Sequence, residues 1–317
     1  MKCFLCTGQW KKTSAEIARR RPVATVKIFE FEELAAATSN FHEDCLLGER
    51  DYGRVYKGQI DSKQVVDHDR IRNFLVELCM LSWLRHPNIV SLAGYCADGD
   101  HRLLVYENVQ LGSLKEHLHD SAPDKKQLDW KTRMKIASEA AKGLEYLHDI
   151  QQPTVIHCGI NCSNILLGEG YQAKLSGFGF AKLGPPDGKT HVSATFEGNY
   201  GHQAPDMRGE CTNRAIECEI RCLQLWGCPF GDLYRKERYR KFKRWRRVQS
   251  YYLGKTIDQR RQILRNGSHY PATGLKQAVL IASTCVQKQP HARSTMAEVV
   301  TSLPYIAHGK YDSVTLS

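Results

Sequence analysis

Two short segments carry the residue types most able to do chemistry. Residues 155–167 read VIHCGINCSNILL, in which His157 precedes Asn164 by seven positions. Histidine is the side chain most often used as a general base, and amide oxygens can bind hard cations. Gly159 lies between these residues, and Gly177 follows in the segment SGFG at 176–179. Because glycine has no side chain, neither position can accept a proton or bind a metal ion through one.

The elements that must position these segments follow from the pattern of apolar residues. The pattern predicts a short helix at 29–38, a strand-rich stretch with a glycine turn at 46–66, a helix at 74–84 and two strands within 90–106. From residue 113 onward helices dominate, including a long one with an apolar face between residues 134 and 147 and two more near the end. A small sheet-rich lobe followed by a larger helical lobe is therefore expected.

A series of short motifs identifies a family resemblance. In chain order they are FEELAAAT (31–38), RVYKG (54–58), HPNIV (86–90), LLVYE (103–107), GSL (112–114), GLEYLH (143–148), SNILL (163–167) and KTHVS (189–193). From about residue 29 to residue 307 the chain resembles plant receptor-like cytoplasmic serine/threonine kinases of the Pelle-type receptor-kinase group. The resemblance implies an α+β, two-lobed protein-kinase-like fold, with a β-rich N-lobe and a larger helical C-lobe.

The resemblance also implies a nucleotide site in the N-lobe, of which only part remains. Gly48, Gly53 and Val55 match the family's glycine-rich loop, but Arg50 replaces its middle glycine, where the backbone should approach the phosphates. The alternative is that Arg50 binds a phosphate as a cation. Further remnants of this site are Tyr106, Glu107 and Val109.

The family's phosphate-binding lysine is missing. The following strand reads QVVDHDR (64–70) and leads almost directly into the helix, so the lysine's ion pair with Glu77 cannot form as it does in the family. Lys57 and Lys63 lie nearby in the sequence and are interpreted as exposed strand and turn residues. ATP and Mg²⁺ would be the family ligands, and neither is expected to bind tightly.

The resemblance assigns the family's catalytic positions to the two segments described first. Gly159 stands at the position of the catalytic Asp, and Gly177 at that of the Mg²⁺-binding Asp, whereas His157 and the metal-binding position Asn164 are retained. Loss of a positioned base costs roughly 10²–10⁴ in rate, and loss of metal ligation removes further charge stabilisation. The chain is therefore predicted to be impaired as a kinase.

The activation segment retains more of the family pattern. Ser193 is a candidate phosphate acceptor, and Asn199 stands where the family usually has Thr. Asp206 replaces the usual Glu of the Ala-Pro-Glu motif, and its expected partner is Arg293. Shortening the acidic side chain could preserve this ion pair with some shift.

Residues 214–262 do not fit the family, because the hydrophobic central helix of the C-lobe is expected there. Gly227 and Pro229 interrupt any helix in this stretch. Suitable synonymous codons for residues 220–232, read one nucleotide later, encode YDVYSFGVVLLE, which resembles the missing helix. We therefore hypothesise a frame-shifted segment and a disrupted central helix, with family-like sequence resuming near residue 270.

This segment also accounts for most of the positive charge. The net charge is +11, and residues 235–247 hold nine basic residues and one acidic residue, or +8, which leaves +3 for the rest of the chain. Basic and aromatic residues in alternation can indicate nucleic-acid or anionic-membrane contact. A frame shift explains them without a partner, so nucleic-acid binding is not expected. The same reasoning applies to a zinc site; its candidate ligands are Cys211, Cys218, Cys222 and Cys228.

The N-terminus bears on location. No apolar run is long enough for a membrane span, and the first residues lack the apolar core of a signal peptide, so an intracellular protein with mostly reduced cysteines is expected. Cys3 and Cys6 lie near a basic patch and are candidates for S-acylation at the inner face of the plasma membrane. The alternative is a tail with two free thiols.

These observations define the expected organisation and three functional hypotheses. The expected domains are a basic, disordered tail (1–27), an N-lobe with an N-terminal extension (28–109), a C-lobe (110–308) containing the aberrant segment, and a tail (309–317). The leading hypothesis is a catalytically inactive kinase-like scaffold or decoy whose partners are signalling proteins, including an upstream receptor kinase. The alternatives are residual serine/threonine kinase activity with a base such as His157, and a non-functional pseudogene product.

Overall fold

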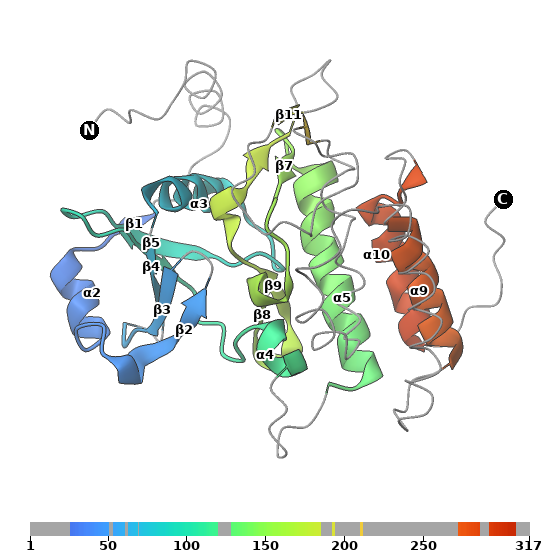
Figure 1. The fold of residues 1–317 in the computed structure, drawn as a ribbon, viewed down its shortest axis with the longest axis horizontal. Coiled ribbons are helices and arrows are strands. Elements are labelled where there is room, and N and C mark those ends of the chain that lie inside the picture. Colours follow the sequence, from blue (N-terminus) through green and yellow to red (C-terminus); the bar gives the residue numbers. More distant parts are fainter. Residues whose placement is uncertain are drawn as a thin grey trace, which may run out of the picture. The chain divides into compact units, whose positions relative to one another are not determined.

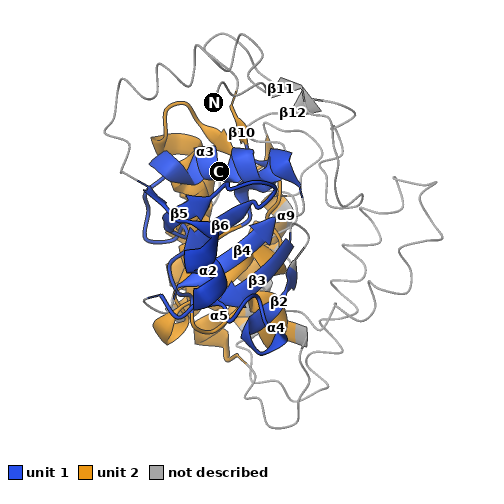
Figure 2. Cartoon of the chain, turned by 90° about the vertical axis from the view of Figure 1, so that its left-hand side faces the viewer, with its two compact units in different colours: residues 1–109, 177–181 blue, residues 110–176, 182–317 orange. Residues whose placement is uncertain are grey.

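The computed structural model describes residues 26–50, 53–60, 63–68, 70–119, 128–184, 192–193, 210–211, 272–285 and 292–308. The chain divides into two units (Figure 2). Unit 1 comprises Met1–Val109 and Gly177–Ala181, and unit 2 comprises Gln110–Ser176 and Lys182–Ser317. Residues 177–181 thus group with unit 1, although the sequence analysis placed them in the second lobe, because they pack against a helix of unit 1.

Unit 1 is built on a six-stranded sheet with the order β1-β5-β6-β4-β3-β2 (Figure 1). The strands are β1 (Lys27–Ile28), β2 (Leu46–Arg50), β3 (Gly53–Lys57), β4 (Gln64–His68), β5 (Leu92–Cys96) and β6 (Leu103–Tyr106). All pairings are antiparallel except that of β1 with β5. Every residue of β6 and most of β4 are buried, because both strands have neighbours on each side. The strands predicted within 46–66 and 90–106 are confirmed.

The N-terminal extension is part of the unit 1 core. Helix α2 (Phe31–Ala37) begins where the Asp98 carboxylate accepts a hydrogen bond from the Phe31 amide at 3.0 Å. A carboxylate at this end of a helix satisfies a free amide and complements the helix dipole. Phe29 is buried in a cluster with Leu34, Val65, Cys96, Leu103 and Val105. The short helix predicted at 29–38 is confirmed.

Helix α3 (Ile71–Trp83) presents one face to the unit 1 core. Its buried residues are Asn73, Phe74, Glu77, Met80 and Leu81, spaced so that they share a face of the helix. Glu77 is the acidic member of this buried set. A carboxyl group on an apolar face requires hydrogen-bonding partners, since burying a charge without them is costly. This requirement makes Glu77 a candidate functional residue.

Unit 2 is mainly helical in the part that the structure describes. Its helices are α4 (Leu114–His119), α5 (Trp130–Glu145), α9 (Ala272–Cys285) and α10 (Met296–His308), and a π-helical turn (Tyr146–Ile150) extends α5. Helix α10 packs against both α5 and α9 (Figure 1). Helix α5 begins at Asp129, whose side chain accepts a hydrogen bond from the Thr132 amide at 2.7 Å. The predicted long helix and the two C-terminal helices are confirmed.

Short strands hold the loops of unit 2. Strand β7 (Val155–Ile156) pairs with β10 (Lys182–Leu183), and β8 (Ile165–Leu167) pairs with β9 (Ala173–Leu175). A further pair joins β11 (Val192–Ser193) to β12 (Glu210–Cys211). Residues 157–164 connect β7 to β8, and Ser176 follows β9 directly. The strands thus fix both ends of the segment that carries His157 and Asn164.

Several sequence predictions lie outside the described residues. They include residues 1–25 of the tail predicted at 1–27, the tail at 309–317 and the aberrant segment at 214–262, with its candidate frame shift, basic run and disrupted helix. Lys27, which the prediction placed in the tail, lies in strand β1 because it pairs with β5. Within the described ranges, every helix is too short or too polar to cross a membrane. The cysteines described there are free thiols.

Candidate functional site

Strands β2 and β3 carry the remnants of the glycine-rich loop. Their register places Gly48 opposite Val55 and Arg50 opposite Gly53. Gly53 has φ +149°, and a Cβ at this position would lie 1.7 Å from the carbonyl oxygen of Asp67 on β4. Only glycine fits at this position, because the backbones of β3 and β4 approach each other closely there. Val55 is buried beside it.

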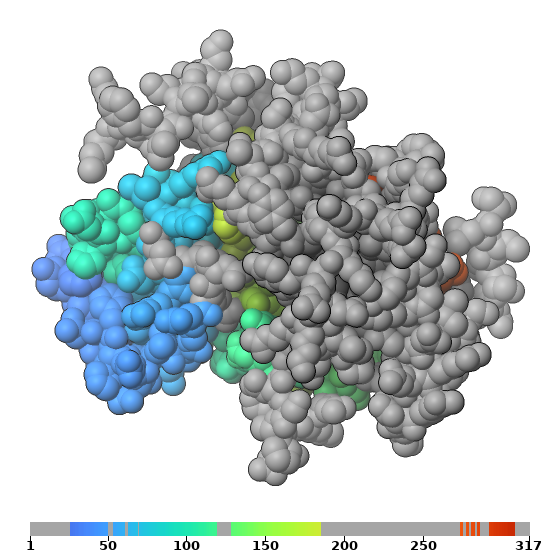
Figure 3. Space-filling view, in the orientation of Figure 1, coloured from blue at the N-terminus to red at the C-terminus, as the bar shows by residue number. Residues whose placement is uncertain are grey.

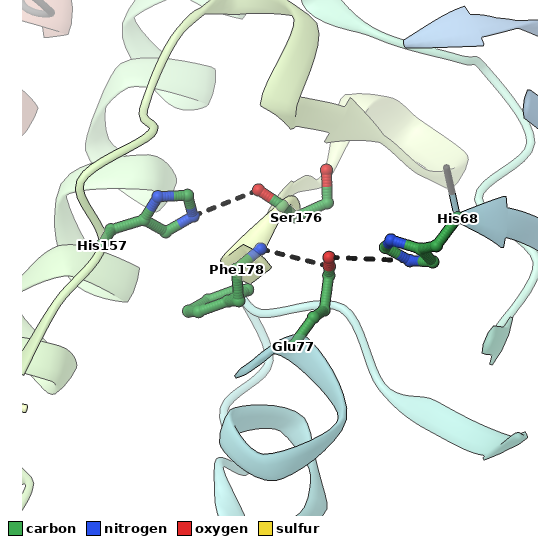
Figure 4. Close-up of polar contacts among 5 residues, drawn as sticks. All are labelled: His68, Glu77, His157, Ser176 and Phe178. Atoms are coloured by element: carbon green, nitrogen blue, oxygen red, sulfur yellow. Dashed lines mark hydrogen bonds and ion pairs between the residues drawn. The ribbon is translucent and has the colours of Figure 1, made fainter. Parts of the chain in front are cut away.

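Strand β4 ends at His68, a residue that the sequence analysis did not single out. Its imidazole is fully buried, and Nε2 lies 3.9 Å from Oε2 of Glu77 (Figure 4). Burial lowers the pKa of His68 to about 4. His68 therefore faces the carboxylate that the family pairs with a lysine, but as a neutral group at neutral pH. The available sequence signal was a histidine ending an apolar strand just before the helix that carries Glu77.

The carboxyl group of Glu77 also binds the segment that follows Ser176. Its Oε1 accepts a hydrogen bond from the Phe178 amide at 3.1 Å (Figure 4). Burial raises the pKa of Glu77 to about 7, and interactions with Tyr106 and with the backbone of residues 177–179 oppose this increase. Glu77 is thus held by groups of the protein itself.

The strand that ends in Tyr106 leads to the remaining nucleotide-site residues. Tyr106 and Val109 are buried, and the Val109 carbonyl accepts a hydrogen bond from Gln64 Nε2 at 3.0 Å. The Glu107 amide donates to the Ser91 carbonyl at 3.0 Å, and the Glu107 carboxylate accepts from the Ser91 amide at 2.8 Å. These groups therefore have partners within unit 1.

In unit 2, His157 is fixed by two hydrogen bonds. Its Nδ1 accepts from the Gly159 amide at 3.2 Å, and its Nε2 lies 3.1 Å from the Ser176 carbonyl oxygen (Figure 4). Nε2 must therefore donate to that carbonyl, because a carbonyl only accepts. The ring is fully buried. This arrangement weighs against His157 as a replacement base, since neither nitrogen is exposed to a substrate.

Asn164 is likewise part of an internal network. Its Nδ2 donates to the Gly159 carbonyl at 2.6 Å, and its own carbonyl accepts from the Ser176 amide at 2.9 Å. Asn161 supports the same loop, because its Nδ2 also donates to the Gly159 carbonyl, at 3.3 Å. The loop thus keeps its shape through backbone and amide groups, without a carboxylate at position 159.

The residues at the family's metal positions do not fit Mg²⁺. This ion requires oxygen ligands, usually carboxylates with substrate phosphates. Gly159 and Gly177 offer no side-chain oxygen, and the Asn164 side chain is tied to Gly159. Within the described ranges, no three His, Cys, Asp or Glu side chains are grouped in a way that could hold a metal ion. We therefore derive no catalytic step through magnesium.

The other predicted site residues are only partly described. The backbone of Ser193 lies in β11, opposite Glu210 of β12. Arg293 is buried immediately before α10, but Asp206 lies outside the described residues, so their ion pair stays a prediction. The candidate acylation sites Cys3 and Cys6 also lie outside, as do the proposed zinc ligands Cys218, Cys222 and Cys228.

Comparison with known proteins assigns the class. Residues 41–212 match the family described as protein tyrosine and serine/threonine kinase. The chain is 44% identical over 328 residues to the probable serine/threonine-protein kinase PBL7 of Arabidopsis thaliana, covering 98% of this chain and 86% of that protein. The chain therefore belongs to the protein kinase family, and its fold is the two-lobed protein kinase fold, with a β-sheet N-lobe and a helical C-lobe.

Two further relatives from Arabidopsis thaliana are longer. Serine/threonine-protein kinase PBS1 is 46% identical over 318 residues, covering 90% of this chain and 65% of the relative. Serine/threonine-protein kinase PBL27 is 44% identical over 326 residues, covering 96% of this chain and 62% of the relative. The chain thus spans less than two thirds of the length of both.

Proposed function

We propose that this chain is a catalytically inactive member of the serine/threonine kinase family, similar to receptor-like cytoplasmic kinases, that acts as a signalling scaffold or decoy. One observation carries the proposal: the polar residues that remain near the lost catalytic positions are bound to the chain itself. His157 and Asn164 bind within their own loop, and Glu77 binds the backbone of residues 177–179. Groups committed to internal hydrogen bonds hold the fold rather than a nucleotide.

The chemistry of phosphoryl transfer supports the same proposal. Catalysis in kinases depends on positioning and on neutralising charge with a lysine, two metal-binding residues and a base. This chain has His68 facing Glu77 in place of the lysine and glycine at positions 159 and 177. The losses in reaction rate that follow from removing several residues of one catalytic unit are not additive, but the loss caused by any one of them is severe. The remaining residue types support the proposal of an inactive protein.

The scaffold role requires a folded surface. The described residues of α2, β2 and β3 form a continuous blue surface in the space-filling view (Figure 3). The partners we propose are signalling proteins, among them an upstream receptor kinase that phosphorylates Ser193. Contact with the plasma membrane through acylated Cys3 and Cys6 would place the protein at the cytoplasmic face, near such a receptor.

The proposal is tested with the purified full-length chain. Titration calorimetry with Mg²⁺-ATP is expected to show no binding in the micromolar range, and an active receptor-kinase catalytic domain is expected to phosphorylate the chain. Ser193→Ala should remove that phosphorylation, with Ser163→Ala as a matched control in another loop. Tight Mg²⁺-ATP binding would contradict the inactive assignment, and equal phosphorylation of both variants would contradict Ser193 as the acceptor.

Residual kinase activity is the second candidate, favoured by the family membership and by the names of the relatives. His157, the base proposed for this activity, is buried with both nitrogens hydrogen-bonded, which weighs against it. The third candidate is a pseudogene product that folds poorly. Such a product should unfold non-cooperatively on heating, whereas a folded scaffold should unfold cooperatively.

A further inference from the structure

The turn that begins at Gly177 forms an anion-binding concavity. Gly177 adopts a left-handed conformation (φ 76°, ψ 51°), and Phe178–Phe180 continue as a right-handed 3₁₀ turn. A left-handed residue beside right-handed ones directs successive backbone amides toward one point. The Glu77 carboxyl group occupies that point, with the Phe178 amide 3.1 Å from Oε1.

The opposite side of the same carboxyl group faces the sheet. His68, at the end of β4, places Nε2 3.9 Å from Oε2 of Glu77. Tyr106, at the end of β6, also interacts with this carboxyl group and lowers its pKa. Glu77 and Phe178 are fully buried, and His68 and Tyr106 are nearly so. Three elements of unit 1 therefore converge on one side chain of α3.

The packing around this group leaves little freedom. A Cβ at Gly179 would lie 2.9 Å from Cβ of Asn73 on α3, closer than real side-chain contacts allow. Residues 177–181 thus lie directly against α3, with the Phe178 ring in the core. Such close contact fixes the distance between the Glu77 carboxyl group and the turn.

We propose that Glu77, supported by His68 and Tyr106, forms a latch that holds helix α3 and residues 177–181 together without nucleotide or metal. The partners of the carboxyl group come from this chain, and a neutral histidine occupies the place where a cation would be expected. The latch would operate whether or not the protein transfers phosphate. It gives the N-lobe one fixed arrangement, as a constitutive binding surface requires.

The charge state of the latch is consistent with this role. The groups that face Glu77 are His68 from β4, Tyr106 from β6 and the backbone amides of residues 177–179. Burial raises the pKa of Glu77 to about 7 and lowers that of His68 to about 4. Between these values both side chains are neutral, so the buried site needs no bound cation for compensation.

Hydrogen exchange of the full-length chain, measured by mass spectrometry with and without Mg²⁺-ADP, tests the latch. Peptides from residues 71–83 and 177–181 should exchange slowly and at the same rate in both conditions. Glu77→Ala should increase exchange in both peptides by more than about tenfold, because the Phe178 amide loses its acceptor. Glu77→Gln should retain most of the protection, since its amide oxygen still accepts.

A matched control separates the latch from general destabilisation. His148 is a partly buried histidine of unit 2, and His148→Gln should leave both peptides unchanged. Protection that appears only with Mg²⁺-ADP, or that survives Glu77→Ala, would overturn the latch. If Glu77→Ala does not fold, Glu77→Gln measured without nucleotide decides, because the latch predicts slow exchange in both peptides and fast exchange would contradict it. These comparisons of variants are made without nucleotide, so their failure is distinct from failure of the inactive-kinase proposal.

Discussion

The side-chain amide of Asn164 donates a hydrogen bond to the carbonyl oxygen of Gly159 at 2.6 Å. This bond joins the position where the family has a metal-binding residue to the position where it has a catalytic Asp. In this chain the bond stabilises the loop between residues 159 and 164. The family-like outline of the segment therefore has a structural explanation that does not require phosphotransfer.

Asn164→Ala is expected to lower the free energy of unfolding by about 0.5–1.5 kcal/mol, because it leaves the partly buried Gly159 carbonyl with only the longer Asn161 bond. Urea denaturation followed by circular dichroism measures the change. Asn161→Ala, which is less buried, is the matched control and should cost about half as much. An equal cost for both variants would contradict the assigned importance of the Asn164 bond.

Gly94→Ala is expected to displace the N-terminal extension. A Cβ at Gly94 would lie 2.2 Å from Cε2 of Phe29 and 2.5 Å from the Lys27 carbonyl oxygen. Overpacking of this kind typically costs about 1–3 kcal/mol. In Gly99→Ala, the control, the new Cβ has nothing within 4 Å, and only the strain of its φ of +52° remains. Faster exchange in residues 26–38 of Gly94→Ala alone is the expected result.

The latch predicts opposite pH profiles for two variants. In the unfolded chain Glu77 loses its proton near its ordinary pKa of 4.5, whereas in the folded protein it keeps the proton up to about pH 7. This difference makes the free energy of unfolding fall as pH rises through the interval. In the unfolded chain His68 gains a proton near its ordinary pKa of 6.5, whereas in the folded protein it stays neutral down to about pH 4. This difference makes the free energy of unfolding rise with pH between these two values. Between about pH 4.5 and 6.5 the two effects cancel in the unmodified protein.

Relative to the unmodified protein, Glu77→Gln should therefore gain stability with rising pH between about 4.5 and 6.5, at about 1.4 kcal/mol per pH unit. His68→Gln should lose stability at a similar rate over the same interval. Denaturant titrations at four pH values provide the measurement. Parallel profiles for the two variants would show that these side chains do not titrate as the buried geometry requires. The partly buried His148 titrates equally in all three proteins and drops out of the differences.

The frame-shift hypothesis predicts the nucleotide sequence of the gene. Codons for residues 220–232 should encode YDVYSFGVVLLE when read one nucleotide later. The family match ends at residue 212, immediately before this segment, although the relatives align over most of the chain. Codons incompatible with the shifted reading would remove the hypothesis, and the basic run would then need a functional explanation.

Most of the fold followed from the sequence, because its elements have strong local signals. The apolar stripe of α5 and the buried strands β4 and β6 repeat with regular periods, and Gly48 of β2 and Gly53 of β3 lie on either side of the chain reversal. Gly159 and Gly177 could also be matched to the family's catalytic positions, since a missing carboxylate is visible in a motif, and their effect on activity stays a prediction. These features depend on residues close together in the chain.

The role of His68 did not follow from the sequence. Its contact with Glu77 joins the end of a strand to the second turn of a helix. The grouping of residues 177–181 with unit 1 was also missed, because it depends on the burial of Phe178 against α3. Contacts between distant segments carry little local signal. The available clue was Glu77, a charged residue within the buried face of α3.

A phosphotransfer assay tests the central claim most directly. The purified chain, with radiolabelled ATP, Mg²⁺ or Mn²⁺ and a general acceptor protein, is predicted to incorporate no more label than a heat-denatured sample. An active relative from the same family serves as the positive control. Metal-dependent incorporation into the acceptor that exceeds the denatured control, and that is lost in a folded Asn164→Ala variant, would contradict the account.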